Sequence, residues 1–187
     1  GAVGGNLTLT SVTGNVTQGV ALAVTGTTTV TTSADDATIT LNTSTNAFTG
    51  AVTLTTNDGD GTAADVTIDG GTTALVIAAS TVDGDLTLTS GNVAGITDTG
   101  TLTIGGNLSA TTDDNAGVVT LDSLAVDGSI ALATNSTGNA TVSNDAGLIF
   151  AASTVGGTLS ATAVTGNVSD TGTQAITGAA TYITQAT

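Results

Sequence analysis

Residues 5–11 read Gly5-Asn-Leu-Thr-Leu-Thr-Ser11, and residues 84–90 read Gly84-Asp-Leu-Thr-Leu-Thr-Ser90. Apolar and polar side chains alternate with a period of two in both stretches, which is the pattern of a β-strand with one buried face. The β-branched threonines favour the strand conformation further. Variants of this glycine-led phrase recur along the whole chain, with leading residues Gly5, Gly26, Gly50, Gly84, Gly106, Gly128, Gly157 and Gly178.

Successive leading glycines are spaced by 21, 24, 34, 22, 22, 29 and 21, so three longer units are predicted near 1–79, 80–152 and 153–187. A segment of about 21 residues with three short strand-like runs corresponds to one coil of a solenoid, which buries its apolar side chains only by stacking on its neighbours. We therefore predict an all-β, parallel β-helix of about eight coils, forming a single segment over 1–187. At the usual strand spacing the rod would be about 40 Å long. The two long spacings are interpreted as coils with extended turns at 57–64 and near 135–139.

The alternation also predicts which way each side chain points. The second and fourth residues after each leading glycine should face the core, and the third and fifth should form outward ladders of threonine, interrupted at Ala131 and Ala133. Thr28 occupies a core position and would need a hydrogen-bond partner there. The predicted core positions are Leu7, Leu9, Thr28, Val30, Val52, Leu54, Leu86, Leu88, Leu108, Ala110, Ile130, Leu132, Leu159, Ala161, Ala180 and Tyr182.

The composition excludes several classes of function. The chain has no Lys, Arg, His or Cys, and its fifteen acidic residues, all Asp, give a formal net charge of −15. Nothing neutralises phosphates, so nucleic-acid binding is excluded, and no histidine, cysteine or lysine is available as a nucleophile or base. The longest apolar runs are far shorter than the ~20 residues of a membrane-spanning helix, so no membrane insertion is expected. We predict that the chain is not an enzyme and has no active site.

Aspartates supply the candidate sites. The run from Asn57 to Gly61 contains Asp58 and Asp60 and resembles a short calcium loop, because hard cations bind several oxygen ligands at turn spacing. We predict that any divalent cation, calcium above all, binds first at Asp58 and Asp60. The pairs Asp35-Asp36 and Asp113-Asp114 occupy equivalent positions after their phrases and are interpreted as polar turn residues. The other Asp residues are likewise expected at turns along the sides of the rod.

Five stretches resemble the repeats of filamentous-haemagglutinin-like adhesins, which are giant bacterial surface or secreted proteins. They are GNLTLTS (5–11), TGNVTQ (13–18), LAVTGTTTV (22–30), NAFTGAVTL (46–54) and AASTVGGTLSATAVTGN (151–167). The resemblance covers essentially the whole chain and implies a right-handed parallel β-helix. Such repeats usually form the stalk of the adhesin, and the resemblance implies an extracellular or cell-surface location.

We therefore expect a structural or adhesive module of an extracellular bacterial fibre, without catalysis. The chain is expected to be an internal portion of a longer fibre, whose partners are neighbouring repeats stacked end to end, and host or environmental glycans or surfaces. The alternative is a β-helix that binds or cleaves carbohydrate with Asp residues. Ice binding through the threonine ladders is a third alternative, disfavoured by the uneven coil lengths and by Ala131 and Ala133.

Overall fold

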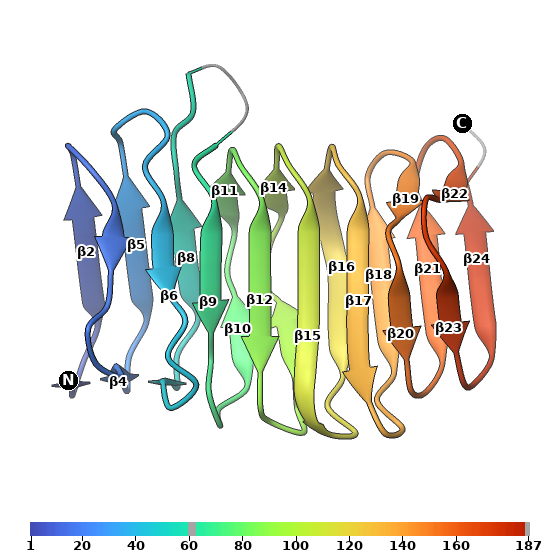
Figure 1. Ribbon diagram of the computed structural model, residues 1–187, viewed down its shortest axis with the longest axis horizontal. Coiled ribbons are helices and arrows are strands. Elements are labelled where there is room, and N and C mark those ends of the chain that lie inside the picture. The colour runs from blue at the N-terminus through green and yellow to red at the C-terminus, as the bar shows by residue number, and fades with distance from the viewer. Residues whose placement is uncertain (60–62, 186–187) are drawn as a thin grey trace.

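The glycine-led phrases form strands, and each strand pairs in parallel with a strand one coil further along the chain. The computed structural model describes residues 1–59 and 63–185, and within these ranges every regular element is a β-strand. Figure 1 shows the front strands running downward and the rear strands running upward while the chain advances from the N to the C end. This sense of rotation makes a right-handed parallel solenoid of about eight coils, so the predicted fold class is confirmed.

Two large sheets form the front and rear of the solenoid, and a small sheet flanks its first coils (Figure 1). The rear sheet contains β2 (Leu7–Ser11), β5 (Thr28–Thr32), β8 (Val52–Thr55), β10 (Leu75–Ile77), β11 (Ser80–Val82), β13 (Ile96–Asp98), β14 (Leu102–Ile104), β16 (Val119–Val126), β18 (Ala140–Asn144), β21 (Leu159–Ala163) and β24 (Ala180–Thr184). The front sheet contains β3 (Val16–Thr17), β6 (Ile39–Leu41), β9 (Val66–Asp69), β12 (Leu86–Ser90), β15 (Leu108–Asn115), β17 (Ile130–Asn135), β19 (Leu148–Phe150), β20 (Ser153–Val155), β22 (Val168–Asp170) and β23 (Gln174–Ile176). The small sheet contains β1 (Ala2–Val3), β4 (Ala23–Val24) and β7 (Ala47–Phe48).

The core lies between the two large sheets and is built from columns of inward side chains. One column in the front sheet runs coil to coil through Val66, Leu86, Leu108, Ile130 and Phe150, all at most 1% exposed. Burial of each large side chain contributes about 1.5–3 kcal/mol. The predicted core positions are buried in six of the eight phrases, whereas those of the first coil are half-buried and those of β24 are exposed.

The phrases do not stack in one continuous series, which corrects the predicted arrangement. Gly5, Gly26 and Gly50 lead strands of the rear sheet, Gly84, Gly106 and Gly128 lead strands of the front sheet, and Gly157 and Gly178 lead strands of the rear sheet again. Along the chain, the glycine-led strands therefore switch from one large sheet to the other twice. A phrase suits either sheet because both sheets present one side to the core and the other to solvent.

Where the strands switch from one large sheet to the other, the chain contains a further phrase that the glycine pattern did not reveal. Register places Val66 beside Leu86, so Ala64 occupies a leading position between Gly50 and Gly84. Ala64 is fully buried with φ 62°, a left-handed conformation that normally favours glycine. Register likewise places Ala140 beside Leu159, so Gly138 leads a phrase between Gly128 and Gly157. These strands were hidden because one begins with alanine and the other carries Ser143 where the pattern has threonine.

Coil lengths are consequently more uniform than the glycine spacing suggests. One coil carries the chain from Ala140 to its partner Leu159, and a longer one carries it from Ile39 to its partner Val66. The interpretation of the spacings of 34 and 29 as single extended coils is wrong, since they divide into 14 and 20 and into 10 and 19. Because coils of 19 and 27 residues still occur, both arguments against ice binding remain.

Hydroxyl side chains form hydrogen bonds in the turns that follow several of the glycine-led strands. The sixth residue after the leading glycine also points inward, and its Oγ donates to a turn carbonyl: Thr32 to Ala37, Thr112 to Gly117 and Thr134 to Gly138, at 3.1, 2.9 and 2.6 Å. The recurrence of Ser or Thr at this position is visible in the sequence. Thr28 is different, because its hydroxyl is fully buried and has no hydrogen-bond partner among the described residues, so the expected partner is not found.

An Asn or Asp side chain in the turn before several of the strands that a phrase leads hydrogen-bonds to the next coil. Asp65 Oδ1 accepts the backbone N–H of Asp85 at 2.8 Å, and Asp85 Oδ1 accepts that of Asn107 at 2.6 Å. The leading glycines beside these Asn and Asp side chains let the backbones of successive coils approach closely. A Cβ added at Gly128 would lie 2.7 Å from the carbonyl carbon of Gly106. Backbone pairing, the Asn and Asp side chains and the leading glycines thus hold successive coils at one fixed spacing.

Replacement of Leu88 by alanine should lower the free energy of unfolding by about 2–5 kcal/mol, because Leu88 is fully buried and neighbouring coils prevent collapse of the cavity. Thr87→Ala on the outward side of the same strand is the control and should cost less than about 1 kcal/mol. Denaturant unfolding measures both. Equal losses would contradict the assignment of the inward and outward faces.

Candidate functional site

The turns after β5 and β8 bring three carboxylates together. Ligand oxygens of Asp35, Asp36 and Asp58 all lie within 4.8 Å of one another, with Asp35 and Asp36 exposed and Asp58 half-buried. Asp36 adopts a left-handed turn conformation with φ 58°. The cluster joins two successive coils, because its members come from turns about one coil apart in the sequence.

The structure places two further carboxylates beside one residue of the predicted calcium pair. Asp58 lies in the cluster, but its described neighbours are Asp35 and Asp36, and Asp60 lies outside the described residues. Neighbouring backbone groups orient two of the carboxylates: Gly59 N–H donates to Asp35 Oδ1, and Ala63 N–H donates to Asp58 Oδ2 at 2.8 Å. Sequence spacing could not show that Asp35 reaches Asp58, because only coil stacking brings them together.

The two Asp pairs that occupy equivalent positions after their phrases lie in different surroundings. Asp35 and Asp36 follow β5 in the rear sheet, whereas Asp113 lies near the end of β15 in the front sheet. Asp113 instead faces Asp69 at the end of β9, where the two negative charges repel. The change of face between the phrases accounts for this separation.

Burial perturbs two carboxyl groups along the sides. Burial, followed by the nearby charge of Asp113, raises the pKa of Asp69 above its ordinary value, against the opposing hydrogen bond from Gly71 N–H at 2.7 Å. Burial also raises the pKa of Asp98, although its oxygens accept the N–H groups of Asp122 and Ser123. These groups bind a proton more tightly in the folded chain than in the unfolded chain.

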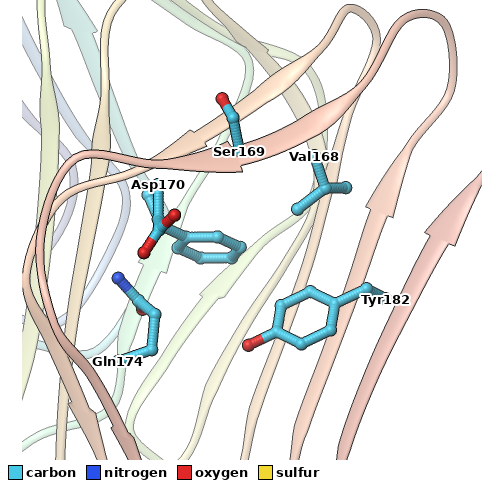
Figure 2. A pocket seen from close by; sticks show the side chains of 6 residues that line it. Val168, Ser169, Asp170, Gln174 and Tyr182 are labelled. Atoms are coloured by element: carbon cyan, nitrogen blue, oxygen red, sulfur yellow. The ribbon is translucent and has the colours of Figure 1, made fainter.

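A cavity of about 420 Å³ lies between β22, β23 and β24. It is lined by Phe150, Val168, Ser169, Asp170, Gln174 and Tyr182 (Figure 2). The Phe150 and Tyr182 rings meet edge to face, with centroids 6.2 Å apart and planes at 76°. Phe150 is buried at the base, whereas Tyr182 is 46% exposed. The sequence analysis did not identify this cavity.

The pairing of the strands reveals a signal for this cavity in the sequence. Asp170 pairs with Phe150 and so continues the column of inward apolar residues that includes Leu108 and Ile130. Asp170 thus places a carboxylate at a position where earlier coils carry leucine, isoleucine or phenylalanine. This substitution is visible only once the pairing partners of each strand are known, and composition does not show it.

Three segments of the chain, residues 1–55, 63–136 and 137–187, match the model of the DUF5649 family, described as repeats of unknown function. The chain belongs to this family. The DUF5649 units correspond to the faces of the solenoid: the first ends with β8, the second begins immediately before Ala64, and the third begins immediately before Gly138. Each unit thus places the strands that its phrases lead on one sheet, and the next unit places them on the other.

No curated protein and no solved structure matches the chain. The described residues also contain no helix of the length and apolar character needed to cross a membrane.

Calcium should raise the Tm of the chain, because a cation shared by Asp35, Asp36 and Asp58 would link two coils and offset their mutual repulsion. Asp58→Asn should abolish most of the rise, whereas Asp127→Asn at an exposed turn should leave it intact. Thermal unfolding with calcium and with EDTA makes the comparison. A rise of the same size in both variants would assign the effect to screening of the net charge.

Asp69→Asn should raise the Tm at pH 7, because the substitution removes a partly buried charge that faces Asp113 while its Oδ1 keeps the Gly71 hydrogen bond. The folded state holds the Asp69 proton more tightly, so this site gains stability as the pH falls from neutral through its raised pKa towards the ordinary value of 3.8. The advantage of the variant should therefore shrink on acidification. Asp127→Asn, the control for loss of one exposed charge, should give a smaller gain, and an equal gain would contradict the prediction.

Proposed function

We propose that the chain is a rigid, non-catalytic segment of an extracellular bacterial fibre or adhesin stalk. The observation that carries the proposal is the continuous parallel pairing of strands from β2 to β24, in which each coil forms the template for the next. A structure of this kind extends along one axis by repetition, as solenoids do. The resemblance of the repeats to filamentous-haemagglutinin-like proteins supports the same function.

Packing and hydrogen bonding support the rigidity of the segment. Nearly all inward apolar side chains between β4 and β21 are fully buried, and buried Thr or Asn side chains hydrogen-bond to turn carbonyls at several corners. About 40 Å of rod is thereby held by backbone pairing along its whole length. Such a body keeps two attached parts at a fixed distance, which is the task of a stalk.

The surface chemistry is consistent with an extracellular fibre. Turn residues such as Asp35, Asp83, Asp127 and Asp145 place negative charge along the sides, where like charges oppose lateral association. The partners proposed for the ends are further DUF5649 units, because the interface between two coils is already repeated throughout the chain. Absence of His, Lys and Cys from the sequence supports a function without catalysis.

Two copies of the sequence joined in tandem should form a particle with about twice the axial length and the same cross-section, measured by small-angle X-ray scattering. A rod predicts that the maximum dimension grows linearly with chain length, whereas a globule grows with a power of about 0.38. A single copy of the chain is the reference. A tandem chain whose cross-section widens while its length stays constant would contradict the proposed function.

A further inference from the structure

We draw no further inference here: the strongest candidate, the outward row of threonines that runs from coil to coil on the rear sheet through Thr10, Thr31, Thr55, Thr81 and Thr103, is an unpartnered sheet face, and nothing in the structure shows what covers it.

Discussion

Backbone hydrogen bonding between successive coils is the interaction on which the rest of this molecule depends. Parallel pairing sets the distance between coils, and it places residues of one kind above one another, so that Val66, Leu86 and Leu108 form a continuous apolar column. The same pairing explains the glycines at the head of each phrase, since Gly106 and Gly128 approach too closely for a side chain. The apolar columns of the core, the turns between strands and the rows of outward side chains all depend on this spacing between coils.

Period-two alternation predicted the strands and most of their inward residues, and the recurrence of the glycine-led phrase predicted the parallel solenoid. Alternation was insufficient to predict which sheet a phrase joins, because inward and outward positions look alike on either face. The steps at Ala64 and Gly138 escaped detection because an alanine with positive φ replaces glycine in one, and Ser143 replaces threonine in the other. Asp58 and Asp60 stay a prediction for a calcium site, and the proximity of Asp35 and Asp36 to Asp58 becomes visible only after the coils are stacked.

Absence of cationic side chains shapes every polar feature of the fold. Carboxylates are paired with backbone N–H groups, as when Asp98 accepts from Asp122 and Ser123, because no lysine or arginine is available. Where carboxylates face one another, as Asp69 faces Asp113, the repulsion has no internal compensation. Stability should therefore depend on the ions in solution more than it does in proteins of balanced charge.

The alternation of long strands between the two sheets has a consequence for evolution. Insertion or deletion of a segment as short as the one from Gly128 to Gly138, or the one from Gly50 to Ala64, moves the following strands to the opposite face without breaking the register of the stack. Half a coil is therefore a unit by which this fold can lengthen or shorten, as well as a whole coil.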